Sequence, residues 1–317
     1  MELCIIIPAY NCLDTIEKTL KSISIQDLSV EYEVVLVNDC SDYDYSTIIN
    51  NYSNKINIRE IKTKKNIGPG AARQFGIDNS SSKYITFIDG DDCFYDKYSL
   101  SKLYNEINKT NVDVVIGNFI YERDNKKIVQ KKDFIWLHGK IYRRKFLEDN
   151  NIYFNNTRSN EDQGFNRLIS FLNPKVSYIN KIVYIYKENS NSITRKNTRL
   201  YDFEGLEWLC YNINWAIEEA EKRGFKSYLT SYEPLYLLAT LYFYYIDLQY
   251  EYDVSKILLW TKELYTRYMR IESIIDDNMI NNIIEDNKNF FKDYMDIKEY
   301  NISFNEFLDL IKKENNL

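Results

Sequence analysis

The segment Tyr84-Ile85-Thr86-Phe87-Ile88-Asp89-Gly90-Asp91-Asp92 places three carboxylates within four residues, directly after a short apolar run. The β-branched and aromatic residues at 84–88 predict a buried strand. Open α/β sheets bind their ligands beyond such strand ends. Carboxylates this close repel one another unless a cation lies among them, and their oxygens suit Mg²⁺ or Mn²⁺. The alternative interpretation is a solvated acidic turn, so the segments upstream decide between the two.

Two further apolar runs precede this strand. Residues 3–8 end at a proline, and residues 33–37 lead into Asn38-Asp39-Cys40-Ser41-Asp42. Both runs predict buried strands. Asp14-x-x-Glu17 resembles a capping box that opens a helix reaching about Ser24.

A helix through Ile48 and a strand near 56–61 continue the alternation of strands and helices. This alternation predicts a parallel sheet with right-handed crossovers. The loops after the strands at 3–8, 33–37 and 84–88 then share one edge of the sheet. We therefore expect Asp39 and Asp89 to converge.

A glycine-proline turn, Asn66-Ile67-Gly68-Pro69-Gly70-Ala71-Ala72-Arg73, leads into a helix. Backbone N–H groups at a helix start favour anions, and Arg73 adds a positive charge nearby. The turn is neither a P-loop nor a G-x-G-x-x-G fingerprint. The alternative is that Gly68 and Gly70 serve the turn alone and Arg73 forms a surface ion pair.

The charge of the chain is unevenly spread along its 317 residues, of which 44% are hydrophobic and 28% charged. Residues 201–317 contain 12 Lys and Arg against 22 Asp and Glu, a net charge of −10, and the difference from the totals leaves +4 for residues 1–200. We expect two halves on this basis. The basic first half suits a phosphate-bearing ligand, and the acidic second half argues against tight docking on DNA.

The five cysteines form no C-x-x-C pair, which favours free thiols in a reducing cytosol and no zinc site. Met1 leads directly into a strand without a signal segment. The apolar run 235–246 is too short and too rich in tyrosine to cross a bilayer. These features predict a cytoplasmic protein without a membrane span.

Helical periodicity begins near Asp202. Helices are expected at 202–223 with a stop at Gly224, at 234–249, 254–270 and 278–296, and after a cap at Ser303-x-x-Glu306. Tyrosine and phenylalanine crowd these segments. Core packing is the simplest account, while stacking on a sugar acceptor and a homodimer face through the helical region are alternatives.

The motifs of residues 1–200 resemble those of family 2 glycosyltransferases in order and spacing. The match begins with Pro8-Ala9-Tyr10-Asn11 and continues through 37–41, 66–73 and 87–92. It extends over 139–147, Asn160-Glu161-Asp162, and Tyr186-Lys187 to 192–194. The resemblance implies an α/β GT-A fold, with a Rossmann-like, mostly parallel sheet and flanking helices. Residues 1–200 would be the nucleotide-sugar-binding catalytic domain, and 201–317 an all-helical domain that packs on it and contributes to acceptor choice.

The resemblance also implies roles for single residues. Asp91 would ligate the Mn²⁺ or Mg²⁺ that bridges the donor phosphates, and Asp162 would be the general base. Ala9, Tyr10 and Asp39 would hold the base of the nucleotide, and Asp89 its ribose. Arg73 would contact the nucleotide or the acidic cluster. The family often has Asp at the position of Asn38, and the uridine assignment depends on that position. The full set of residues implied to bind the donor is Pro8, Ala9, Tyr10, Asn11, Asp39, Gly68, Arg73, Asp89 and Gly90.

The expected activity is metal-dependent, inverting transfer of a sugar from a nucleotide-diphosphate donor, UDP-sugar favoured, to an acceptor hydroxyl. The metal absorbs charge on the leaving oxygen, and a base takes the proton of the acceptor. A glycan, a lipid-linked glycan, a protein and, less favoured, a modified DNA base are acceptor classes. A nucleotidyltransferase on a similar sheet and an inactive sugar-nucleotide-binding scaffold are alternatives.

Three features keep more than one interpretation each. Asp162 is a general base or a carboxylate that stabilises the first turn of a helix. His138, the single histidine, is simply packed or exposed, or it lines the acceptor pocket or completes the metal shell. Lys187, Arg195 and Lys196 flank a polar loop that closes over the diphosphate or is an ordinary solvated turn.

Overall fold

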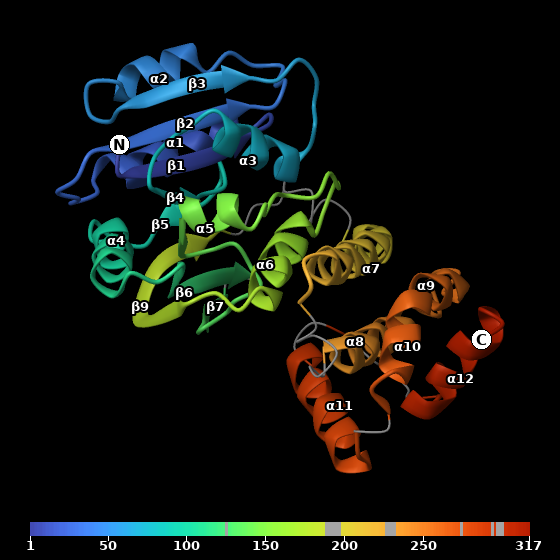
Figure 1. Ribbon diagram of the computed structural model, residues 1–317. Helices are drawn as coiled ribbons and strands as arrows, with labels where there is room; N and C mark the ends of the chain where they lie inside the picture. Colours follow the sequence, from blue (N-terminus) through green and yellow to red (C-terminus); the bar gives the residue numbers. More distant parts are fainter. Residues whose placement is uncertain (124–125, 188–197, 226–232, 273–274, 293–294, 296–300) are drawn as a thin grey trace. The chain divides into compact units, whose positions relative to one another are not determined.

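A computed structural model describes residues 1–123, 126–187, 198–225, 233–272, 275–292, 295 and 301–317. The chain divides into two compact units, Met1–Arg195 and Lys196–Leu317. The first unit is built of strands and helices, and the second of helices (Figure 1). Each unit is described by itself.

A mixed sheet forms the first unit, with strand order β3-β2-β1-β4-β8-β6-β9-β5 and β7 paired to β6. β1 pairs in parallel with β2 and β4, and β2 pairs in parallel with β3. β8 is antiparallel to β4 and β6, while β6 and β9 are parallel. The expected α/β fold with a mostly parallel sheet is confirmed. The strands are β1 (Leu3–Ala9), β2 (Tyr32–Asn38), β3 (Ile58–Lys62), β4 (Tyr84–Phe87), β5 (Cys93–Phe94), β6 (Val114–Arg123), β7 (Lys126–Gln130), β8 (Lys140–Arg143) and β9 (Val176–Tyr186).

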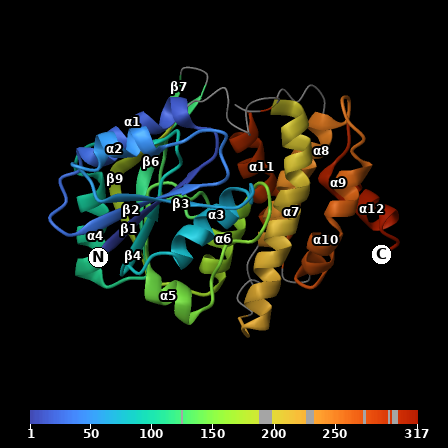
Figure 2. The same cartoon turned by 90° about the horizontal axis from the view of Figure 1, so that it is seen from above.

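Helices cover both faces of this sheet, so β1, β2 and β4 are almost wholly buried. α1 and α4 lie on one side of the strands, and α3 and α6 lie on the other (Figure 2). Burial on both faces explains why these strands are continuous apolar runs. The helices are α1 (Leu13–Ser24), α2 (Ser46–Tyr52), α3 (Pro69–Asp78), α4 (Ser99–Thr110), α5 (Arg144–Asp149) and α6 (Glu161–Phe171).

The predicted capping box of α1 is wrong. The helix begins at Leu13, its N-cap is Cys12, and no side chain caps it. Asp14 is therefore the second helical residue, which is too far into the helix to act as the cap. The start of α1 is held instead by Thr15, whose Oγ1 donates to the backbone oxygens of Cys12 and Gly90.

Six helices form the described part of the second unit, and the expectation of a helical C-terminal region is confirmed. The capping box of Ser303 and Glu306 is present. The helix expected at 254–270 is two helices that meet at Thr261. Buried rings of Tyr242, Phe304 and Phe307 contact one another, in line with core packing. The helices are α7 (Thr198–Lys222), α8 (Glu233–Leu248), α9 (Ser255–Trp260), α10 (Lys262–Met269), α11 (Asp277–Phe291) and α12 (Phe304–Glu314).

Within the described residues, no helix combines the length and apolar character that a membrane crossing requires.

Candidate active site

The loops that follow β1, β2 and β4 lie at one edge of the sheet, because these strands are parallel and in register. The backbone N–H of Asp39 donates to the oxygen of Ala9 at 2.8 Å, and that of Ile88 donates to Ile6 at 3.1 Å. The shared edge expected from the strand pattern is therefore present, and the site is built on it.

Asp39 is almost fully buried and organises the turn that leads into α3. Its carboxylate accepts hydrogen bonds from Thr63 Oγ1 and from the backbone N–H groups of Ile67 and Gly68, each at 2.9 Å. An anion does bind at this helix start, and it is the carboxylate of Asp39 itself. Gly68 has φ +86°, a conformation that favours glycine.

Arg73, on α3, joins two parts of the rim that are far apart in sequence. Its guanidinium forms ion pairs with Asp89, after β4, and with Glu161, at the start of α6, both at 2.6 Å. The side chain is 6% exposed, so the surface ion pair considered for it is excluded. Burial raises the pKa of the Asp89 carboxyl, but the charge and hydrogen bond of Arg73, together with His138, more than offset burial, and the pKa is lowered. Asp89 is therefore held as a carboxylate.

Gly70 allows α3 and α6 to approach each other. A Cβ atom at this position would lie 2.5 Å from Cγ of Glu161, which is shorter than any real contact. The close approach brings Glu161 within reach of Arg73, one turn along α3. The close packing of α6 therefore requires the glycine at this position.

Asp162 lies in the first turn of α6 and is partly buried. Burial, followed by the negative charge of Glu161, raises the pKa of Asp162 to about 7, against the opposing effect of Arg73. Its Oδ1 accepts the backbone N–H of Gln163 at 2.8 Å. A carboxylate with a pKa near neutrality is suited to accept a proton at physiological pH.

Asp92 is fully buried and is held by β9 and the chain that follows it. The hydroxyl of Tyr184 donates to one carboxylate oxygen at 2.6 Å, and the backbone N–H of Lys187 donates to the other at 2.8 Å. Burial and the charges of Asp91 and Asp89 raise the pKa of Asp92 well above its usual range. Asp91, which lies between Asp89 and Asp92 in the sequence, is partly exposed.

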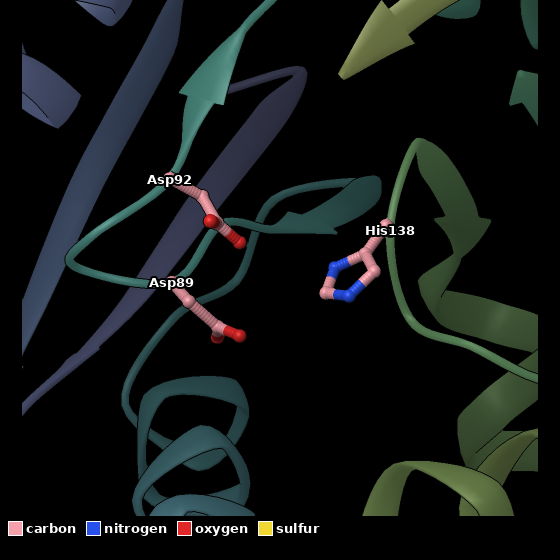
Figure 3. A group of neighbouring side chains, drawn as sticks. All are labelled: Asp89, Asp92 and His138. Carbon is pink, nitrogen blue, oxygen red and sulfur yellow. The ribbon is translucent and has the colours of Figure 1, made fainter. Parts of the chain in front are cut away.

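His138 completes a group of three side chains with Asp89 and Asp92. One ligand atom of each lies within 4.8 Å of the others. The imidazole comes from a separate loop and faces the acidic turn (Figure 3). It is buried against the rings of Tyr184 and Tyr186, at 4.9 Å and 4.6 Å between centroids.

The chemistry of this group fits a divalent cation. Burial lowers the pKa of His138 to about 3, so the imidazole is neutral at physiological pH, as a metal ligand must be. Two carboxylates and an imidazole suit Mn²⁺, while carboxylates and water suit Mg²⁺. Asp91, the metal ligand implied by the resemblance, lies in the same turn but outside this group of three.

The remaining residues implied to bind the donor form the outer part of the rim. The ring of Tyr10 is 48% exposed. Asn11 is tied to the second loop, since its side chain donates to Asp42 at 2.9 Å. Pro8 is half-buried, and Gly90 passes so close to Cys12 that a Cβ atom would lie 2.7 Å from its sulfur. The polar loop expected to close over the diphosphate lies, apart from Lys187, outside the described residues.

A family comparison agrees with this geometry: residues 4–160 match the family model described as "Glycosyl transferase family 2". Residues 4–160 belong to glycosyl transferase family 2. The family match ends at residue 160, so Glu161 and Asp162, the acidic residues at the start of α6, lie just beyond it.

Curated relatives of this glycosyl transferase domain come from several bacteria. The chain is 29% identical over 243 residues to the poly(ribitol-phosphate) beta-N-acetylglucosaminyltransferase TarS of Staphylococcus aureus, covering 70% of this chain and 42% of TarS. It is 28% identical to the glycosyltransferase GlyA of Streptococcus pneumoniae, covering 61% of this chain and 32% of GlyA. The chain thus spans less than half the length of either relative.

A solved structure supports the fold over both units. The crystal structure of S. aureus TarS 1–349 in complex with UDP-GlcNAc matches with a TM-score of 0.61 at 20% identity, covering 92% of each chain. The GT-A fold expected from the resemblance is confirmed by this match.

Three residues of the glycosyl transferase site were given no role by the sequence. Glu161 was part of a quoted motif, and its position beside Asp162 at a helix start was the available signal. Tyr184 lies in β9, a strand that was not predicted. Lys140 is fully buried, with Nζ donating to the backbone oxygen of Trp136 and lying 3.9 Å from Asp133. Burial lowers the pKa of Lys140 to about 8.

Proposed function

We propose that the glycosyl transferase domain moves a sugar from a UDP-linked donor to an acceptor hydroxyl, with inversion of the anomeric centre. The observation that carries the proposal is the buried ion pairing of Arg73. This residue fixes the acidic turn after β4 against the start of α6. One connected network therefore holds both the residues suited to a metal-bound diphosphate and the carboxylate suited to a base.

The donor side of the proposal rests on the first two loops. The exposed ring of Tyr10 provides a face on which a nucleobase can stack. Asp39 shapes the neighbouring turn and contacts the base, while Asp89 contacts the ribose. The UDP-GlcNAc complex of TarS supports uridine as the nucleotide. Asn38 donates to Glu60 at 2.7 Å and its Oδ1 accepts from Ser41 at 2.9 Å, so this residue serves the loop itself.

A divalent cation, Mn²⁺ or Mg²⁺, is the proposed cofactor. Asp91 would hold it on the side of the phosphates, with further oxygen donors from Asp89 and Asp92 in the same turn and a nitrogen donor from His138 on a separate loop. A bound cation would offset the repulsion among the carboxylates and neutralise charge that develops on the leaving diphosphate.

Asp162 is the proposed general base. Its pKa of about 7 keeps a substantial fraction ionised at neutral pH while leaving it basic enough to take the proton of a hydroxyl. Arg73 prevents the charge of Glu161 from raising this pKa further, because the guanidinium neutralises Glu161 directly. Glu161 and Arg73 together therefore set the pKa at which Asp162 can act as a base.

For the acceptor we propose a hydroxyl of a glycan or related polyol. TarS is named for transfer to poly(ribitol-phosphate), and this supports a polymer with free hydroxyls.

Incubation of the protein with UDP-GlcNAc and Mn²⁺ tests the proposal. We expect slow release of UDP even without an acceptor, because water replaces the hydroxyl. Asp162→Asn should abolish this release, while Asp78→Asn, an exposed carboxylate at the end of α3, should leave it unchanged. Release of GlcNAc-1-phosphate in place of UDP would show cleavage between the two phosphates, the bond that a nucleotidyltransferase breaks, and would overturn the proposal.

A further inference from the structure

A pocket lies wholly within the helical unit. It has a volume of about 450 Å³, within the range of small-molecule sites. One wall comes from the first turns of α7, and the other from α9 and the residues just before it. The pocket is lined by Phe203, Glu204, Glu207, Trp208, Tyr252, Asp253, Lys256 and Trp260.

Four aromatic residues contribute to the lining of this pocket. Phe203 is buried and stacks on Tyr252 at 5.0 Å with an interplanar angle of 8°. Trp260 packs against Phe203 at 5.4 Å. Trp260, Tyr252 and Trp208 remain only half-buried, so parts of their rings face the pocket. The stack makes the wall rigid before any ligand arrives.

The polar part of the lining carries an excess of negative charge. Glu204, Glu207 and Asp253 oppose a single Lys256, a formal net charge of −2. Asp253 accepts from Ser255 and its pKa is lowered, in part by Lys256. Glu204 and Glu207 lie on one face of α7, and neither makes a hydrogen bond or ion pair within the described part of the chain. Their charges are therefore not compensated locally.

The aromatic rings and the net negative charge of the lining together favour one class of ligand. An anion is repelled by the net charge, and a purely apolar molecule would take the two glutamates out of water without a partner. A cation satisfies both parts of the lining, because ammonium groups bind over tryptophan and tyrosine faces and pair with carboxylates. We propose that this pocket binds an organic ammonium group. The site is independent of the donor site and of the reaction proposed there.

Choline and its uncharged isostere 3,3-dimethylbutan-1-ol test the proposal on the full chain, with binding followed by ligand-observed NMR. The two molecules have the same shape and differ in charge. We expect saturable binding of choline and binding of the isostere that is weaker by about tenfold. Saturation by choline should leave the UDP-binding behaviour of the protein unchanged.

Three variants separate the charge from the shape of the pocket. Glu207→Gln, at an exposed position where folding is not at risk, should weaken choline binding several-fold. Lys256→Gln should strengthen it, because a competing cation is removed. Trp260→Leu should abolish it. Absence of choline binding, equal binding of the isostere, or weaker binding in Lys256→Gln would each overturn the proposal.

Discussion

At the scale of single residues, the site depends on how three carboxylates are arranged around Arg73. Its guanidinium pairs with Asp89 and Glu161, and Asp162 follows Glu161 directly. The arrangement keeps Asp89 ionised and leaves Asp162 with a pKa near neutrality. Arg73 thereby helps to give two nearby carboxylates different pKa values, a lowered one for Asp89 and one of about 7 for Asp162, while it pairs directly with Glu161.

Asp162→Asn tests the role of the base most simply. The amide keeps the shape and the hydrogen bond at the start of α6 but cannot accept a proton. We expect transfer to fall by about 10²–10⁴-fold, the range typical of a general base. UDP binding, measured by thermal shift, should be retained. Full transfer activity in this variant would show that Asp162 is not the base.

The pH dependence follows from the direction of the pKa shift. Asp162 is protonated below its pKa of about 7 and cannot act as a base there. We expect kcat/KM for transfer to rise by about tenfold per pH unit below pH 7 and then to level off. Glu161→Gln removes a negative neighbour and frees Arg73, so the inflection should move to lower pH. A profile that is flat through pH 7 would contradict the assignment.

A contact of Arg73 with the acidic cluster was among the expectations from the sequence, and the ion pair with Asp89 confirms it, but the pairing of Arg73 with Glu161 was not predicted. Arg73 and Glu161 are 88 residues apart, and no local pattern shows that they meet. Their contact depends on the packing of α3 against α6, which is a tertiary feature. The same holds for Asp39, whose partners at 63–68 were not foreseen even though the turn was predicted to hold an anion.

At the scale of elements, α3 is the part that connects the rim. Its N-terminal turn is held by Asp39, its first turns contact α6, and Arg73 on it reaches Asp89. The geometry of the site therefore depends on the distance between α3 and α6.

Gly70→Ala tests this dependence. Alanine favours a helix over glycine by about 1 kcal/mol, but the added Cβ would overlap Glu161. We expect the overlap to prevail and to lower the free energy of unfolding by about 1–3 kcal/mol, as measured with urea. In a Glu161→Ala background the Cγ atom nearest to the added Cβ is absent, so Gly70→Ala should lower the free energy of unfolding by less. An equal cost in both backgrounds would contradict the close approach.

The capping box of α12 provides a test in the helical unit. Ser303 accepts from the N–H of Glu306, and the Glu306 side chain accepts from the N–H of Ser303. Ser303→Ala should destabilise this unit by about 1 kcal/mol in thermal unfolding. Asn305→Ala, an exposed position in the same turn, is the matched control. Equal stability of the two variants would show that the cap contributes nothing.

The elements differ in how far the sequence revealed them. The parallel strands β1, β2 and β4 were predictable because burial on both faces leaves continuous apolar runs. β6, β8 and β9 were not predicted. β9 is largely half-buried or exposed, as in Ser177 to Lys181, and only Val183 and Tyr184 are buried; its pairing with β6 shifts register at Gly117 and Asn118. The false cap at Asp14 arose because the true helix start, at Cys12, uses no side chain.

At the scale of the whole molecule, the chain combines a glycosyl transferase domain with an acidic helical unit. The family assignment covers residues 4–160, and the division by compactness falls at Arg195. The contribution of the helical unit to acceptor choice, a homodimer through it, and a cytoplasmic location stay predictions. The sequence could not show the aromatic and acidic pocket of this unit, because its walls come from segments about fifty residues apart.

The central claim is that the rim binds a nucleoside diphosphate together with a divalent cation. Thermal unfolding of the full chain with UDP, with and without Mn²⁺, tests it most directly. At about one hundred times the Kd we expect UDP with Mn²⁺ to raise Tm by about 5–10 °C. Asp91→Ala should abolish the part that requires Mn²⁺, whereas Asp27→Asn, an exposed carboxylate elsewhere, should not. No shift with UDP, or a shift indifferent to Mn²⁺ in the unaltered protein, would contradict the account.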